Sequence, residues 1–210
     1  MKVVGLIADI VESREIPARA EFQRNLKFVL DAINGRSAER LLSPFTITIG
    51  DEFQALYVDF QTVFRDIFWI AWQVHPHRIR FAINYNLITT ELNRDSAVGM
   101  DGPVFHGARE QLDVLKQRAS TAIRVGGLAL RSHALINAAL DILCDNVDRW
   151  PRTAVGVLAH DLSGLKAQKM AEPLGVTLRG VYKSMNDNNT QHHGALLRAI
   201  TDELESGMES

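Results

Sequence analysis

The apolar positions of this chain follow two alternating patterns over most of its length. Short apolar runs bounded by turn residues indicate strands, and apolar residues recurring every three or four positions indicate amphipathic helices. We expect strands at residues 3–8, 45–49, 53–58, 79–88 and 120–126. We expect helices at residues 17–34, 59–74, 103–117 and 128–144, and a polar loop at 93–102. The order of elements is therefore β-α-β-β-α-β-α-β-α.

This order contains the split β-α-β arrangement of ferredoxin-like folds. We therefore predict an α+β protein with a ferredoxin-like mixed sheet and helices packed on one face. Strand 3–8 is apolar throughout and is expected to be buried on both sides. In this topology it lies in the middle of the sheet, beside the hairpin formed by strands 45–49 and 53–58.

The pattern changes after Trp150 and Pro151, where only short helices are expected. We place a domain boundary near residue 150, with a ferredoxin-type domain at 1–150 and a small all-α helix–turn–helix domain at 151–210. The polar residues of 186–193 predict a loop or a partly mobile tether.

Composition narrows the class of protein. The chain has 210 residues, 46% of them hydrophobic, which suits a globular protein. Its net charge is −2, so the electrostatic field of the whole protein does not attract nucleic acid or anionic lipid. The single Cys144 excludes an internal disulfide and a cysteine-based zinc cluster, and its apolar helical setting predicts a buried, inert thiol. No signal peptide or long apolar run is visible, so we expect a cytoplasmic protein with no membrane partner.

The main candidate for chemistry is a pair of aspartates. Asp9 ends the first strand, and Asp51 follows Gly50 in the hairpin turn. If the strands are neighbours, the two carboxylates meet at one end of the sheet, and such a pair usually holds a divalent metal or shares a proton. The alternative interpretation is local, because Gly50 and Asp51 are common turn residues and Asp9 can cap the following segment.

Other polar residues are candidates for binding phosphate. Ser13 and Arg14 follow Asp9 and can donate hydrogen bonds to phosphate oxygens. Glu52 is a third carboxylate, although strand alternation points it away from Asp51. His106 is either an acid–base group or phosphate contact, or a packed or solvent-facing histidine.

Three separated segments resemble known families. Ala8-Asp9-Ile10-Val11 and Ile49-Gly50-Asp51-Glu52-Phe53 resemble the metal-binding core of class III nucleotidyl cyclases. Together with residues 46–54 and 101–110, residues 9–14 also resemble the SatD family, bacterial proteins linked by name to acid or stress tolerance. This resemblance spans roughly residues 1–205.

The resemblance implies a site for Mg²⁺ or Mn²⁺ and a nucleotide or another phosphate-bearing molecule. The implied metal-binding residues are Asp9, Ile10 and Asp51. The implied nucleotide or phosphate contacts are Ser13, Arg14, Gly50, Glu52, His106 and Arg109. Ile47, His106 and Glu110 stand where cyclases carry a base-reading Lys, an Asn and an Arg, so we expect cyclase activity to be lost. Cyclase sites often form between subunits, which implies a homodimer by analogy.

Residues Leu165 to Met185 resemble a helix–turn–helix unit, with Gly175 at the turn. Lys166, Lys169, Arg179 and Lys183 against Glu172 leave this segment a net charge of +3. We expect double-stranded DNA to bind through Thr177, Arg179, Tyr182 and Lys183, with Thr177 as the N-cap of the second helix. The same pattern also fits any packed helix pair, including a dimerisation module.

Two functions remain open from the sequence. The first is a SatD-like regulatory protein that binds a metal–nucleotide or phosphate ligand through a degenerate cyclase-like domain and DNA through its helix–turn–helix. The alternative is a metal-dependent nucleotidyl- or phosphoryl-transferase that uses Asp9 and Asp51.

Overall fold

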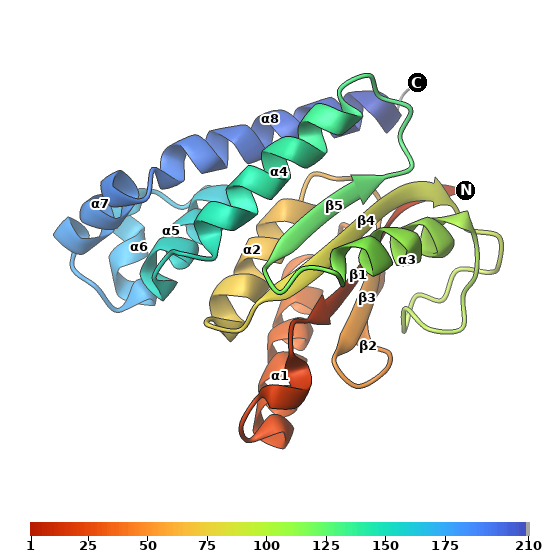
Figure 1. Ribbon diagram of the computed structural model, residues 1–210, viewed down its shortest axis with the longest axis horizontal. Coiled ribbons are helices and arrows are strands. Elements are labelled where there is room, and N and C mark those ends of the chain that lie inside the picture. Colours follow the sequence, from red (N-terminus) through yellow and green to blue (C-terminus); the bar gives the residue numbers. More distant parts are fainter. Residues whose placement is uncertain (209–210) are drawn as a thin grey trace.

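A five-stranded mixed sheet organises the protein. In the computed structural model, which describes residues 1–208, the strand order is β2-β3-β1-β4-β5 (Figure 1). The central strand β1 (Lys2–Ile10) pairs antiparallel with β3 (Glu52–Tyr57) and β4 (Ile79–Leu87). The edge strand β2 (Leu41–Ile47) pairs antiparallel with β3, and β5 (Ala122–Gly126) pairs parallel with β4. The predicted position of the first strand beside the hairpin is confirmed.

Most of the helices lie on one side of this sheet, directly on it or on one another, and share its main hydrophobic core. They are α1 (Arg19–Arg36), α2 (Val63–Val74), α4 (His133–Val147), α5 (Arg152–Leu162) and α8 (Thr190–Met208). The side chains of β1 that enter this core alternate along the strand, as Leu6, Ala8 and Ile10 show. This alternation leaves the other side chains of β1 for the opposite face.

The opposite face is covered by α3 (Pro103–Leu115), so the expectation of helices on one face only is wrong. Val3 and Ile7 of β1 pack there against Ala108 and neighbouring residues of α3. Gly5 permits the close approach, because a Cβ at that position would lie 2.6 Å from Val104 Cγ2. A strand that is apolar on both sides needs cover on both sides, and α3 supplies the second layer.

Some predicted boundaries differ from the structure. The helix expected from residue 128 begins only at His133, because Gly127 has a φ of +84° and the chain turns before the helix. Cys144 is buried as expected, and burial raises the pKa of its thiol. Every helix within residues 1–208 is too short or too polar to cross a bilayer.

The C-terminal segment does not form a separate core. Leu158 of α5 and Leu197 of α8 belong to the same cluster as the helices on the sheet. The helices α6 (Ala167–Leu174) and α7 (Leu178–Asp187) pack with Val157 of α5 around a second, small cluster at one end of the molecule (Figure 1). The structure therefore does not show a separate helix–turn–helix domain, and the boundary near residue 150 stays a prediction.

The tether expected at 186–193 is wrong. Helix α7 continues to Asp187 and α8 begins at Thr190, so only Asn188 and Asn189 separate them. Residues 190–193 lie on the first turn of a long helix that buries Thr190, Gly194, Leu197, Ile200 and Leu204. That spacing, which begins inside the polar tract, is what makes the segment helical.

Candidate functional site

Three charged residues form one row across the end of the sheet. Asp9 in β1 lies opposite Glu52 in β3 and opposite Arg80 in β4. Directly opposite residues of neighbouring strands point to the same face. Asp9 follows Ile7 in the alternation of β1, so this row faces α3. Asp9 and Glu52 were candidates from the sequence, but Arg80, in the strand that lies between β1 and β5, was not.

Asp9 is held by Arg80. Nη1 of Arg80 lies 3.1 Å and 3.3 Å from the two carboxylate oxygens, and both residues are 8% exposed. The rest of the guanidinium donates to the carbonyl oxygen of Arg118, from Nε at 2.9 Å and from Nη2 at 2.6 Å. Burial raises the pKa of Asp9 above its ordinary value, and the charge and hydrogen bond of Arg80 offset only part of that rise.

Glu52 is held from the helix above it. Both terminal nitrogens of Arg109 donate to the two Glu52 carboxylate oxygens, Nη2 at 2.5 Å, and Nζ of Lys116 lies 4.0 Å away. Burial alone would raise the pKa of Glu52, but the hydrogen bonds and charge of Arg109 outweigh it, and the pKa is lowered. Arg109, an expected phosphate contact, therefore lies at the carboxylate row.

Asp51 reaches the same end of the sheet from the hairpin turn. Gly50 has a φ of +67°, a conformation that glycine adopts readily. The start of α1 packs against this turn, where Gln23 Nε2 donates to the Gly50 carbonyl at 3.1 Å and Arg19 Nη2 lies 3.9 Å from Asp51 Oδ1. The charge of Asp51 is the smallest of the causes that act on the pKa of Asp9.

The basic side chains beside the carboxylate row are more exposed than the three acids Asp9, Asp51 and Glu52. Side-chain exposure is 42% for Arg19 and 41% for both Arg109 and Lys116, whereas the three acids are only 12% to 25% exposed. Lys116 is shared with the exposed Asp113, which lies 3.7 Å from its Nζ, but over the row itself the exposed groups are the basic ones. That arrangement favours an anion over a bare cation.

The residues as arranged do not fit a two-metal centre. Nη1 of Arg80 donates to both carboxylate oxygens of Asp9, and a divalent ion there would lie against its positive charge. The side chain of Ile10 is 2% exposed and part of the main core, which leaves only its backbone. Within residues 1–208, no group of three histidines, cysteines or acids is placed to hold a metal ion.

The other expected phosphate contacts are not all brought to this row. His106 is exposed near the N-terminus of α3, where its Nε2 lies 2.7 Å from Asp101 Oδ1. Asp101 is bound to the far end of β4, since its carbonyl accepts from the Thr89 N–H at 3.0 Å. Ser13 is buried in a short 3-10 turn after β1, and Arg14 is exposed in the same turn.

Sequence reasoning missed three basic residues of the site. Arg19 and Lys116 are brought there by helices, and no local pattern places them. Arg80 gave a signal, because it is a charged residue inside a buried strand, and such a residue needs a partner. The partner follows only from the antiparallel register of β1 and β4.

The helices α6 and α7 are joined by a tight turn. Gly175 has a φ of +65°, and the Val176 N–H donates to the Ala171 carbonyl at 3.0 Å, which closes the end of α6. Thr177 is confirmed as the N-cap of α7, since its Oγ1 accepts from the Gly180 N–H at 3.1 Å. Val181 is fully buried between the two helices, in one cluster with Met170.

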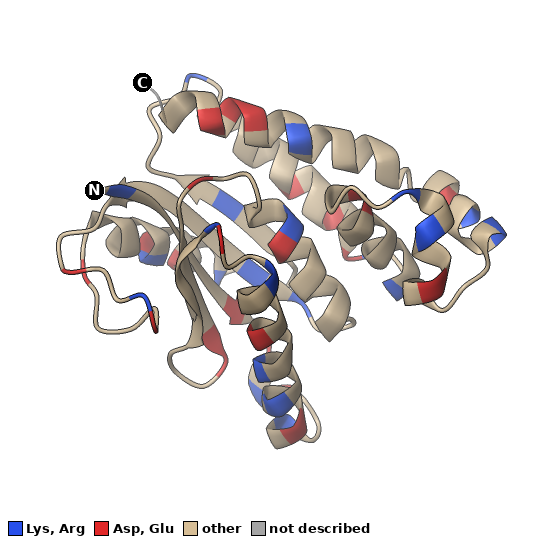
Figure 2. Ribbon diagram, turned by 180° about the vertical axis from the view of Figure 1, so that it is seen from behind, with Lys and Arg blue, Asp and Glu red and all other residues tan. Residues whose placement is uncertain are grey.

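The outer face of α7 carries the expected DNA contacts, and Arg179, Tyr182 and Lys183 are all exposed. Blue segments gather at this end of the molecule, with a few red ones among them (Figure 2). Lys183 pairs with Asp187 one turn further on. Asp187 lies beyond the segment counted in the sequence, so the net charge of this face is lower than that count indicated.

Comparison with known proteins identifies the family. No curated protein sequence matches this chain. A solved bacterial light-regulated adenylyl cyclase is 15% identical, with a TM-score of 0.44, over 59% of this chain and 74% of that one. A guanylate cyclase domain from Catenaria anguillulae, solved with GTP, is 15% identical, with a TM-score of 0.41, over 59% of this chain and 78% of that one. The model of the SatD family matches residues 3–168, which is most of the chain, and this protein therefore belongs to the SatD family.

Proposed function

We propose that this protein is a regulatory binding protein whose sheet takes a phosphate-bearing ligand, with nucleotides as the expected class, and whose helix α7 contacts double-stranded DNA. One observation carries the first half of this proposal. Exposed basic side chains stand over covered carboxylates at the end of the sheet.

Arg109 is the main ligand-binding residue in this account. It now forms a two-pronged ion pair with Glu52, and a phosphate group offers its guanidinium the same fork of oxygens. A phosphate that replaces Glu52 would keep both the hydrogen bonds of Arg109 and the nearby charge of Lys116. Glu52 then takes the place of the ligand when none is bound, and it keeps Arg109 and Lys116 in position.

Binding without turnover is the function we favour. Ile47 has no group that could bond a base edge, and His106 is paired with Asp101. Glu110 is an exposed acid on α3, where a cyclase would need a cation. Because positioning and charge stabilisation do most of the work of phosphoryl transfer, their loss leaves binding without efficient chemistry.

Thermal unfolding with ATP, GTP and inorganic pyrophosphate, in EDTA, tests the ligand. We expect at least one of them to raise Tm, because a ligand that binds only the folded state stabilises it. Arg109→Gln should abolish the rise. His106→Gln is the matched control, since it lies on the same helix but away from the carboxylate row, and it should keep the rise.

The same samples decide between binding and catalysis. Incubation of each nucleotide with Mg²⁺ or Mn²⁺, followed by product analysis, should give no turnover. Turnover that Asp51→Asn abolishes would establish the transferase instead. If none of the probes raises Tm, the proposed ligand site is wrong.

The DNA half rests on the capped α7 and its exposed basic residues. Fluorescence anisotropy with a mixed-sequence duplex at low salt should show binding. Arg179→Ala with Lys183→Ala should weaken it and lower the salt slope by about 2, at roughly 1 per lost phosphate contact. Lys27→Ala is the matched control, because Lys27 forms the same exposed ion pair with Asp31 on α1. If the protein does not bind the duplex at low salt, the proposal that it binds DNA is wrong.

A further inference from the structure

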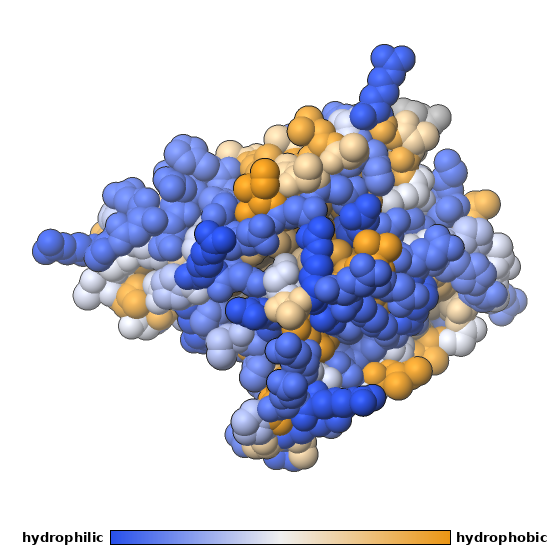
Figure 3. Space-filling view, in the orientation of Figure 1, coloured by the Kyte–Doolittle hydropathy of each residue, from blue (hydrophilic) through white to orange (hydrophobic). Residues whose placement is uncertain are grey.

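Helix α4 carries an apolar stripe on its outer side. Leu135 is 72% exposed and Ile142 is 66% exposed, and the exposed Ala138 lies between them. Positions 135, 138 and 142 fall on one face of a helix. Orange and tan side chains gather over this part of the molecule (Figure 3).

The stripe is not needed for the fold. The opposite side of α4 already buries Ile136, Leu140 and Leu143 in the main core. A helix that is apolar on its inner and outer sides has a second surface to cover, and contiguous exposed apolar residues of this kind mark an interaction surface.

Helix α8 is a neighbour of α4. It lies beside α4 in antiparallel direction, because Ser132 Oγ donates to Glu203 at 2.5 Å and Asn146 Nδ2 lies 3.4 Å from His193 Nε2. The partly exposed Leu196 of α8 lies between these two contacts.

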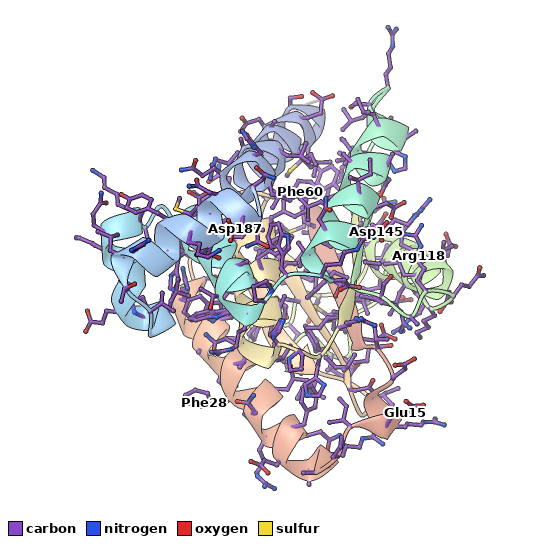
Figure 4. The ribbon with its side chains drawn as sticks, turned by 60° about the vertical axis from the view of Figure 1, so that its left-hand side comes forward. Glu15, Phe28, Phe60, Arg118, Asp145 and Asp187 are labelled. Carbon is purple, nitrogen blue, oxygen red and sulfur yellow. The ribbon has the colours of Figure 1, made fainter. Side chains whose placement is uncertain are left out.

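The charges at the two ends of the stripe are opposite. Arg131, in the turn before α4, and Asp145, near its end, are both exposed. Each is seven positions from Ala138, so the stripe reads basic–apolar–acidic about a small central residue. Figure 4 shows Asp145 on the outer side of α4, near Arg118. Such a surface is complementary to its own copy turned end to end.

We propose that the outer face of α4 binds a second copy of this chain, as an antiparallel helix pair about a two-fold axis near Ala138. Arg131 then meets Asp145 of the partner subunit, and the two ion pairs are related by the symmetry. Leu135 packs beside Ile142 of the partner subunit. The small Ala138 at the axis lets the helices approach to about 8 Å, the lower end of helix packing distances.

The expected affinity is modest. A stable complex buries about 800 Å² on each partner, and one helix face with part of α8 is a small interface by that measure. We therefore expect a dimer that dissociates in the micromolar range. This surface is formed by α4 and α8, and it is independent of the phosphate site that the proposed function uses.

Sedimentation velocity of the full chain across the micromolar range tests the proposal. The wild type should pass from monomer to dimer, and Leu135→Asp or Ile142→Asp should weaken the dimer by about tenfold or more. Phe28→Asp is the control, because Phe28 is 73% exposed and projects from α1 (Figure 4), and it should leave the dimer unchanged.

A charge exchange tests the antiparallel register. Arg131→Asp and Asp145→Arg should each weaken the dimer, and the double variant should restore it, while thermal melts confirm that all three fold. A wild type that stays monomeric overturns the proposal and leaves the stripe to a different partner. A dimer that the stripe variants do not affect, or a double variant that fails to restore it, overturns it as well.

Discussion

Two buried aspartates, Asp9 and Asp66, each have an arginine partner, but they lie in very different surroundings. Asp66 in α2 is fully buried, and its carboxylate accepts from Arg65 Nε at 3.0 Å and from the Tyr57 hydroxyl at 3.1 Å. Arg65 is in turn bound to Ser37. Every partner of Asp66 lies inside the fold, so this network holds β3, α1 and α2 together and offers nothing to a ligand.

Asp9 lies at an edge of the fold instead. Its own pair with Arg80 is covered, but the next charges along the row, Arg109 and Lys116, are partly exposed. A buried ion pair is therefore not by itself a sign of function. The two regions differ in whether a charged side chain near the aspartate can release its partner within the protein and bind a ligand instead.

The largest expected effect is on the Asp66 region. Asp66→Ala should lower the free energy of unfolding by about 3–5 kcal/mol, because it leaves Arg65 and the buried Tyr57 hydroxyl without their acceptor. Urea denaturation measures this, and Asp66→Asn, which keeps an acceptor oxygen, should cost less. A loss below about 1 kcal/mol would show that Asp66 is not a structural centre of the fold.

Asp9→Ala should cost less, about 2 kcal/mol, because Arg80 keeps its two hydrogen bonds to the Arg118 carbonyl. Urea denaturation of both alanine variants under one condition gives the ranking. The comparison between the two regions fails if Asp9→Ala costs more than Asp66→Ala.

The pH dependence separates Asp9 from its neighbour Glu52. Burial raises the folded pKa of Asp9 above its ordinary 3.8, so its contribution to stability is complete below that value and is lost as pH rises through the folded pKa. Arg109 overcomes burial and holds the folded pKa of Glu52 below its ordinary 4.5, so its contribution is present above that value and is lost as pH falls through the folded pKa.

Denaturation at a series of pH values should therefore give opposite slopes. Relative to wild type, Asp9→Asn should gain stability as pH rises above 3.8, and Glu52→Gln should lose stability as pH rises toward 4.5 from below. Slopes of the same sign for the two variants would show that the paired cations do not act as described.

The smallest effect on stability is expected at Lys116. Lys116→Gln should change the free energy of unfolding by less than about 1 kcal/mol, because its ion pairs are partly exposed. It should nevertheless weaken nucleotide binding, whereas Arg65→Gln should destabilise the fold and leave binding unchanged in the folded protein. Equal effects of the two variants on binding would erase the distinction between the regions.

Most of the sheet could be predicted from the sequence. The five strands, the hairpin turn at Gly50 and the place of the first strand beside that hairpin follow from apolar patterns and turn residues, which are local signals. The two-sided apolar strand 3–8 also implies a second layer, but no local signal assigns that layer to α3. The helical start of α8 was hidden, because polar residues on one face of a helix resemble a loop.

The character of the site could not be predicted in the same way. The sequence shows Asp9 and Asp51 without the arginines that lie beside them in the structure, so it indicates a metal site. Arg80 reaches Asp9 through strand register, and Arg109 reaches Glu52 through the packing of α3 on the sheet. Such contacts join residues far apart in the chain. The charge that a ligand meets at the site depends on these contacts more than on any motif.

Isothermal titration calorimetry of GTP tests most directly whether the basic groups, and not a metal, bind the phosphate. In EDTA the wild type should bind GTP, and the double variant Arg109→Gln with Lys116→Gln should lose at least about tenfold in affinity, the effect of roughly 1.4 kcal/mol. Asp9→Asn should bind GTP about as well as wild type. Binding that requires Mg²⁺ or Mn²⁺ and disappears in Asp9→Asn would contradict the account and restore the metal centre.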